Sequence, residues 1–180
     1  MKKVKYAIAF VLALTILMAG CLGGDEDKKD KAVEYTTAKG TTGAEGDVEA
    51  DVTGPPQEFT ETVDIPIGLE NLTAITFQIS VEDGQGENSD ASTNPDEVSG
   101  SLDSSGFNET LPEGKTPYQA TINVKAPEGE NLPSGWTLTL TVVCHPGNDR
   151  WPGPGIWYGV PDNGFSYNVT VEYTYLTPMT

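Results

Sequence analysis

The sequence predicts an all-β fold, a single antiparallel β-sandwich of about seven strands, immunoglobulin-like or jelly-roll in type. Apolar and polar residues alternate in several segments after residue 58, and Gly, Pro, Asn and Asp separate these segments. No segment in this region shows the apolar periodicity of a helix. The Cys-Trp-Cys signature of true immunoglobulin domains is absent.

Strands are expected where the alternation leaves one face apolar and the other rich in Thr. The longest of these segments are residues 75–81, 118–124, 136–144 and 167–175. Shorter candidates are residues 60–67, 97–102 and 106–111. Each strand is expected to be half-buried, with its apolar face in the core.

The formal net charge of −17 over 180 residues limits the classes of partner. So much negative charge repels nucleic acid and anionic lipid surfaces, so a nucleic-acid partner is excluded. It also keeps an exported domain soluble and attracts cations.

The N-terminal end has the composition of a secretory signal peptide. Lys2, Lys3 and Lys5 precede an apolar run over residues 6–17, and small residues follow before Cys21. An uncleaved membrane anchor is the alternative, but the run is shorter than the roughly 20 residues that a spanning helix needs. In both cases the chain after Cys21 is expected to be exported.

Residues 18–21, Met-Ala-Gly-Cys, resemble the lipobox of prokaryotic lipoproteins, although that family most often has Leu where Met18 stands. The resemblance implies that the thiol of Cys21 is lipidated and that cleavage makes Cys21 the mature N-terminus. The lipid would then hold the protein on the extracellular face of the cell membrane. Of the two cysteines, Cys144 is left without a partner, and it is expected to be a small buried hydrophobic residue.

Residues 21–57 are predicted to be a disordered acidic tether. They are polar and charged, show no apolar periodicity and end in Gly54-Pro55-Pro56. Such a segment cannot bury enough apolar surface to offset its ordering entropy. The predicted organisation is therefore a signal peptide at 1–20, the tether at 21–57 and a β-sandwich domain at 58–180.

N-glycosylation sequons occur at Asn71, Asn108 and Asn168. In the last predicted strand Asn168 and Thr170 share the polar face, so this sequon is expected to be accessible in the folded domain. The alternative is that these residues are ordinary polar members of Thr-rich strands.

Residues 82–103 form an acidic segment without Lys or Arg. Its candidate Ca²⁺ ligands are Asp83, Glu87, Asp90 and Asp96, because Ca²⁺ prefers carboxylate, amide and carbonyl oxygens in flexible geometry. The spacing of an EF-hand is missing. The alternative is a solvated acidic loop without a metal.

The Gly- and Pro-rich segment 145–164 is expected to be a long loop. Its aromatic faces can stack on sugar rings or peptide side chains, and its polar side chains can supply hydrogen bonds. The alternative is a lid that packs over one end of the sandwich. The candidate ligand-binding residues are Trp151, Trp157, Tyr158, Asp162 and Asn163.

The sequence contains no catalytic constellation. His145, the single histidine, follows Cys144 directly, and neighbours on a strand point to opposite faces, so a Cys-His dyad is not expected. No Ser-His-Asp set with supporting motifs, phosphate loop or zinc spacing is present. The chain is therefore not expected to be an enzyme.

The layout of the chain resembles small archaeal surface lipoproteins, with a lipobox, an acidic tether and one β-sandwich. Residues 137–144, followed by Pro-Asp-Asn-Gly at 161–164 and by residues 169–173, look like the closing strands of such domains and, more faintly, like the jelly-roll P domain of subtilisin-like proteases. We therefore expect a membrane-anchored extracellular lipoprotein with a non-enzymatic structural or ligand-binding sandwich. Its expected ligands are carbohydrate or Ca²⁺, and its expected partner is a surface glycan or surface protein. The alternative is an accessory subunit that docks onto a larger cell-surface or transporter complex.

Overall fold

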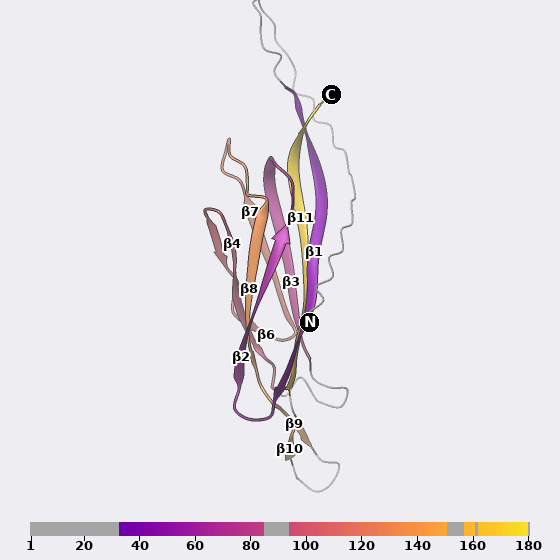
Figure 1. Ribbon diagram of the computed structural model, residues 1–180, viewed down its shortest axis with the longest axis vertical. Coiled ribbons are helices and arrows are strands. Elements are labelled where there is room, and N and C mark those ends of the chain that lie inside the picture. The colour runs from indigo at the N-terminus through magenta and orange to yellow at the C-terminus, as the bar shows by residue number, and fades with distance from the viewer. Residues whose placement is uncertain (1–32, 85–93, 151–156, 161, 180) are drawn as a thin grey trace, which may run out of the picture.

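The computed structural model describes residues 33–84, 94–150, 157–160 and 162–179, and in these ranges the chain folds into β-strands (Figure 1). The strands are β1 (Tyr35–Val52), β2 (Gln57–Pro66), β3 (Leu72–Asp83), β4 (Glu97–Ser104), β5 (Phe107–Thr110), β6 (Gly114–Lys115), β7 (Tyr118–Lys125), β8 (Gly135–Cys144), β9 (Gly147–Arg150), β10 (Trp157–Val160) and β11 (Asp162–Pro178). Among the described residues, no helix has the length and apolar character needed to cross a membrane.

Two antiparallel sheets form the sandwich, which confirms the predicted fold class. The four-stranded sheet has the order β1-β11-β3-β7, and the five-stranded sheet has the order β2-β8-β4-β5, with β6 beside β4. Strands β9 and β10 pair as a separate two-stranded hairpin. Every segment predicted to be a strand corresponds to a strand of the two sheets, namely β2, β3, β4, β5, β7, β8 or β11.

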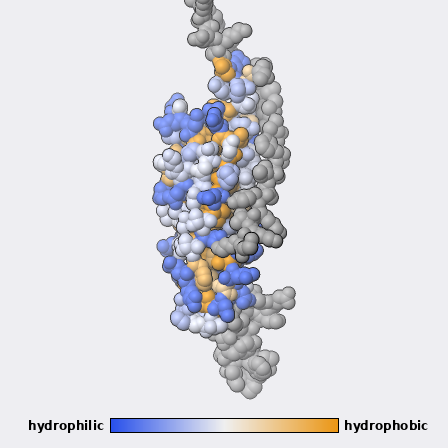
Figure 2. Space-filling model, viewed as in Figure 1, coloured by the Kyte–Doolittle hydropathy of each residue, from blue (hydrophilic) through white to orange (hydrophobic). Residues whose placement is uncertain are grey.

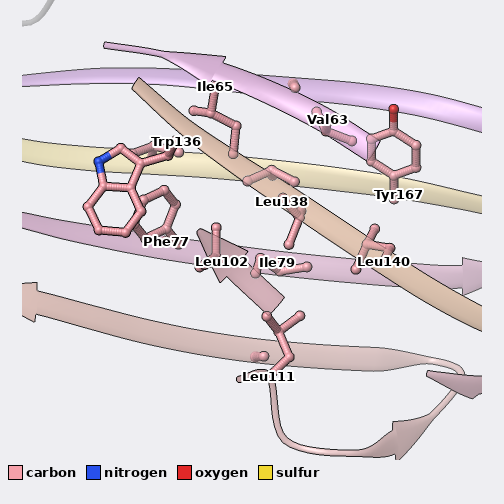
Figure 3. Close-up of a cluster of buried hydrophobic side chains, with 14 of the residues drawn as sticks. Val63, Ile65, Phe77, Ile79, Leu102, Leu111, Trp136, Leu138, Leu140 and Tyr167 are labelled. Carbon is pink, nitrogen blue, oxygen red and sulfur yellow. The ribbon is translucent and has the colours of Figure 1, made fainter. Parts of the chain in front are cut away.

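The core lies between the inner faces of the two sheets (Figure 3). Phe77 of β3 meets Trp136 of β8 across it, with ring centroids 5.2 Å apart and planes tilted by 58°. The indole Nε1 of Trp136 donates a hydrogen bond to the carbonyl oxygen of Pro133 at 3.0 Å, so its polar atom is satisfied. Fully burying one such side chain contributes about 1.5–3 kcal/mol, and the alternation in the sequence supplies one at every second position.

The outer faces are polar, as the Thr-rich half of the alternation predicted. Gln78 of β3 and Asn168 of β11 are exposed on the four-stranded sheet, while their strand neighbours Ile79 and Val169 are buried. The view in Figure 2 shows mostly hydrophilic and intermediate residues over the described surface, with hydrophobic atoms between them.

The prediction of a disordered tether up to residue 57 was wrong for Tyr35–Val52. These residues form β1, which pairs antiparallel with β11 from Tyr35 opposite Pro178 to Val52 opposite Asp162. A bulge interrupts the register between Glu49 and Val52. The strand has few large apolar residues, so its stability comes mainly from the β11 backbone and from side chains of β11.

Glycines in β1 make room for two tyrosines of β11. Gly40 lies opposite Tyr173, and a Cβ at Gly40 would be only 2.5 Å from Cζ of that ring. Gly46 lies opposite Tyr167 in the same way, and a Cβ there would be 2.5 Å from its hydroxyl oxygen. The aromatic rings therefore cover positions at which β1 has no side chain, an arrangement that is known to stabilise glycines in sheets.

The expectation of a long loop over residues 145–164 also needs correction. Strands β9 and β10 lie within it and pair from Gly147 opposite Val160 to Arg150 opposite Trp157. The last strand, β11, begins at Asp162 and not near residue 167. Pairing of β11 with the end of β1, which the sequence analysis did not anticipate, extends β11 toward this hairpin.

The strand directions separate two ends of the sandwich (Figure 1). At the entry end the described chain begins at Val33, and the N–H of Met179 donates to the carbonyl oxygen of Glu34 at 2.7 Å, so the first and last described residues lie together. Val33, Tyr35 and Met179 are exposed there. At the opposite end, called the distal end here, β1, β3 and β8 finish and β4 and β11 begin, beside the β9–β10 hairpin.

A Gly43→Ala substitution tests whether β1 is part of the folded domain. A Cβ at Gly43 would collide with the backbone oxygen of Val169, so the substitution is expected to lower the free energy of unfolding by about 1–3 kcal/mol. The matched control is Gly135→Ala at the start of β8, where a Cβ meets nothing within 4 Å and the expected change is within about 0.5 kcal/mol. Urea denaturation measures both, and equal stabilities would show that β1 does not contribute to the fold.

Candidate functional site

Three ionisable side chains lie close together inside the distal end of the sandwich. They are Asp96, Cys144 and Asp162, and one ligand atom of each lies within 4.8 Å of the others. All three residues have a relative exposure of 0%. Cys144 ends β8, Asp96 directly precedes β4, and Asp162 begins β11, so both sheets contribute to the cluster.

Two local features hold Asp162 in the cluster. Its Oδ1 accepts a hydrogen bond from the N–H of Gly164 at 2.7 Å, which closes a tight turn of the backbone. Gly164 has a φ of 97°, and a Cβ there would overlap the backbone oxygen of Val48, so only glycine fits. The bulge in β1 and this glycine therefore set where Asp162 points.

Hydrogen bonds with two other segments hold Asp96. Its N–H donates to Oγ1 of Thr116 at 3.0 Å, and the N–H of Thr116 donates to its carbonyl oxygen at 3.0 Å. Its Oδ1 accepts from the N–H of His145 at 2.9 Å, which ties Asp96 to the residue that follows Cys144. One oxygen of each carboxyl group is thus bound to backbone.

The second oxygen of each carboxyl group, Oδ2, differs from Oδ1 in its hydrogen bonding. Oδ2 of Asp96 and Oδ2 of Asp162 are buried, and neither has a hydrogen-bond partner among the described residues. Burial is the main cause that raises the pKa of Asp96, the N–H of His145 opposes it, and the charges of Asp162 and Asp83 and a hydrogen bond with the Asp162 carboxyl add to the rise, so the pKa is about 8. At pH 7 Asp96 is therefore mostly protonated, and its hydroxyl can donate to Asp162.

Cys144 is buried and free, as the sequence predicted, but its surroundings are acidic. Burial raises the pKa of its thiol well above the ordinary value, and the charges of Asp96 and Asp162 raise it further. A catalytic cysteine needs the opposite shift, because the thiolate is the nucleophile. The described geometry therefore gives Cys144 no nucleophilic character.

The predicted Ca²⁺ ligands divide between described and undescribed parts of the chain. Glu87 and Asp90 lie outside the described residues. Asp83 ends β3 at the distal end and is partly exposed, and its charge acts on Asp96. Asp96 itself is buried between the sheets and does not belong to a solvated loop.

Four of the five predicted ligand-binding residues are described, and they lie at the same end of the molecule. Trp157 and Tyr158 are in β10, Asp162 and Asn163 begin β11, and Trp151 lies outside the described residues. Asn163 is exposed, whereas Asp162 is buried in the cluster. The structure therefore joins Asp162 to Asp96, which the sequence analysis had placed in a separate site.

The sequons differ in their surroundings. Asn168 is exposed on the outer face of β11, and Oγ1 of Thr170 lies 3.4 Å from its Oδ1, so the two share one face as expected. Asn108 is exposed in β5 and its amide donates to Asp103. Asn71 is partly buried, has a φ of 59° and accepts a hydrogen bond from Asn131 at 3.3 Å. Asn108 and Asn168 are therefore both exposed on strands, and Asn168 lies on a strand that is paired along both edges.

A shallow polar groove runs beside Asn168 on the outer face of the four-stranded sheet. Glu45 and Asp47 of β1 and Glu82 of β3 line it. These carboxylates give the groove a negative potential. A neutral or cationic ligand would fit there, but the groove contains no buried polar group that points to one.

Comparisons with known proteins give distant similarity to solved structures alone. No family profile matches the chain, and no curated protein matches it. Among solved structures the chain is similar to a carbohydrate-binding module, TmCBM61, in complex with β-1,4-galactotriose. The TM-score is 0.29 at 7% sequence identity, over 83% of this chain and 90% of that chain. A TM-score this low supports no correspondence between residues.

An Asp96→Asn substitution tests the electrostatics of the cluster in the presence of a chelator. Asp96 keeps its proton up to about pH 8 when folded but releases it near 3.8 when unfolded. Its contribution to stability is therefore present at low pH and falls as the pH rises through this window. Asn carries no titrating proton and can still donate to Asp162, so the variant is expected to be more stable than wild type at pH 8 by at least about 1 kcal/mol.

Thermal melts between pH 4 and 8 measure this difference, which corresponds to a Tm gap of several degrees that closes toward pH 4. The matched control is Asp103→Asn, because Asp103 is exposed and its hydrogen bonds with Ser101 and Asn108 lower its pKa. The control is not expected to remove the loss of stability toward pH 8. A gap of the same size at pH 4 and pH 8 would contradict the raised pKa of Asp96.

Proposed function

We propose that the protein is a lipid-anchored, extracellular binding module whose β-sandwich presents its distal end away from the membrane. The sequence supports the anchor, because a Lys-rich start and an apolar run lead into Met-Ala-Gly-Cys at residues 18–21. Lipidated Cys21 would then tie the chain to the bilayer ahead of β1.

The observation that carries this proposal is the opposite placement of the two ends. The chain enters the sandwich at Val33, beside the exposed Tyr35 and Met179. The β9–β10 hairpin lies at the other end of the molecule with the start of β11 (Figure 1). A bilayer attached through Cys21 would face the entry end and leave the distal end accessible to ligands.

Carbohydrate is the ligand class that we propose for the hairpin. Trp157 and Tyr158 are adjacent in β10, and Asn163 is exposed at the start of β11. Aromatic faces next to amide and carboxylate groups are the usual means of binding sugars, since the rings stack and the polar groups accept or donate hydrogen bonds. A non-enzymatic role fits the cluster as well, because Cys144 is a protonated, buried thiol.

Lipidation can be tested directly with a Cys21→Ser variant of the full-length chain. Wild type is expected to partition with membranes, and its mature N-terminal peptide is expected to carry acyl chains by mass spectrometry. The variant is expected to lose both properties, because the serine offers no thiol. The control is Cys144→Ser, which should keep the acyl chains. An unmodified Cys21 in wild type isolated from membranes would refute the anchor.

Ligand binding by the hairpin can be tested with a Trp157→Ala variant on an array of oligosaccharides. Loss of one stacking ring is expected to weaken binding by about tenfold, with the Tm unchanged. Tyr35→Ala is the matched control, because Tyr35 is an exposed aromatic residue at the entry end. Equal weakening by both substitutions, or no retained glycan for wild type, would contradict the proposal.

A further inference from the structure

The cluster at the distal end differs from an ordinary acidic surface patch because its members are buried and come from separate segments. Asp96, Cys144 and Asp162 come from three separate segments and are each at 0% exposure, with ligand atoms within 4.8 Å of one another. Both Oδ2 atoms are buried without a hydrogen-bond partner among the described residues. Buried polar atoms are almost always satisfied, so each such atom calls for an explanation.

A single shared proton explains only part of this arrangement. It joins the two carboxyl groups, and the thiol of Cys144 can donate to either of them, but two acids and a thiol still lie buried within 4.8 Å of one another. A divalent cation would compensate both carboxylates and would give the thiol a role as well. We propose that Asp96, Cys144 and Asp162 form a buried site for a borderline-soft divalent transition metal, with Zn²⁺ as the reference ion.

The donor set selects this class of metal. Zn²⁺ accepts thiolate and carboxylate ligands together, whereas Ca²⁺ requires six to eight oxygens and Mg²⁺ keeps its waters. Ligands of a tetrahedral zinc ion stand roughly 3.5 Å apart, so donors within 4.8 Å reach that spacing by side-chain movements on the order of 1 Å. The site thus shares Asp96 with the Ca²⁺ site expected in the acidic segment but differs from it in its other ligands and in its ion.

The surroundings already orient the ligands. The N–H of His145 binds Oδ1 of Asp96 at 2.9 Å, and the N–H of Gly164 binds Oδ1 of Asp162 at 2.7 Å, which leaves both Oδ2 atoms for the ion. Hydrogen bonds of this kind fix the ligands of known metal sites. The three ligand atoms within 4.8 Å of one another come from Asp96, Cys144 and Asp162, and water can complete the coordination of the ion.

Metal binding to the cluster can be written with balanced charge and protons. The thiol of Cys144 loses its proton to solvent, and Asp96 does so if it is protonated. Two carboxylates and one thiolate then face an ion of charge +2, so the bound cluster carries one net negative charge. Metal affinity is therefore expected to rise with pH.

Cobalt is the probe for this site, because thiolate-bound Co²⁺ has a near-ultraviolet charge-transfer band. The protein to titrate is the full-length chain with Cys21→Ser, in which Cys144 is the remaining thiol of the two in the sequence. We expect the band to saturate at one Co²⁺ per chain, to disappear when Zn²⁺ displaces Co²⁺, and to accompany a rise in Tm.

Substitutions of single residues identify which side chains bind the metal. Cys144→Ala in the same background is expected to abolish the band, and Asp162→Asn to weaken Co²⁺ binding at least tenfold, with melts showing that both remain folded. Glu97→Gln is the matched control, because Glu97 is an exposed carboxylate next to Asp96 that pairs with Lys115 at 3.6 Å, and it should leave binding unchanged. Absence of the band, its persistence in Cys144→Ala, or a rise in Tm with Ca²⁺ but not with Zn²⁺ would overturn the inference.

Discussion

The pairing of β11 on both of its edges is the constraint on which the rest of the molecule depends. One strand, Asp162–Pro178, binds β1 along one edge and β3 along the other, so it holds the first and last described segments of the chain in one sheet. Its inner side chains Phe165, Val169 and Val171 are almost fully buried. Its first residue, Asp162, belongs to the distal cluster. Core, sheet order and candidate site therefore all require β11 to keep one register.

The strands with large apolar residues could be predicted from the sequence, and β1 could not. Burial of Ile75, Phe77 and Ile79 follows from their alternation, whereas β1 is rich in Gly, Thr and Glu and reads as a linker. The sequence does contain a weaker indication of a strand here, because small or β-branched residues occupy every second position of β1. These positions are Ala38, Gly40, Thr42, Ala44, Gly46, Val48, Ala50 and Val52. Their meaning depends on Tyr167 and Tyr173, which lie far away in the sequence and fill the space.

Each member of the candidate site could be noticed in the sequence for its own reason, but their proximity to one another could not be predicted. Asp96 stood out as an acid in an acidic segment, Asp162 as a polar residue near aromatics, and Cys144 as an inward-facing residue of an alternating strand. Their meeting depends on β4 lying beside β8 and on β11 extending to the bulge of β1. Sheet order cannot be predicted from a local sequence pattern. The three residues therefore come together only through long-range strand pairing.

The antiparallel ladder between β1 and β11 has a mechanical consequence. In a protein anchored as proposed and held by a ligand at the hairpin, tension pulls β1 outward from Val33 and pulls β11 the opposite way from Asp162. Hydrogen bonds of an antiparallel pair stand perpendicular to the strands, so this force loads the whole ladder in shear and not bond by bond. With the entry end and the hairpin at opposite ends, the β1–β11 ladder, the longest pairing among the described strands, is the contact that resists this tension.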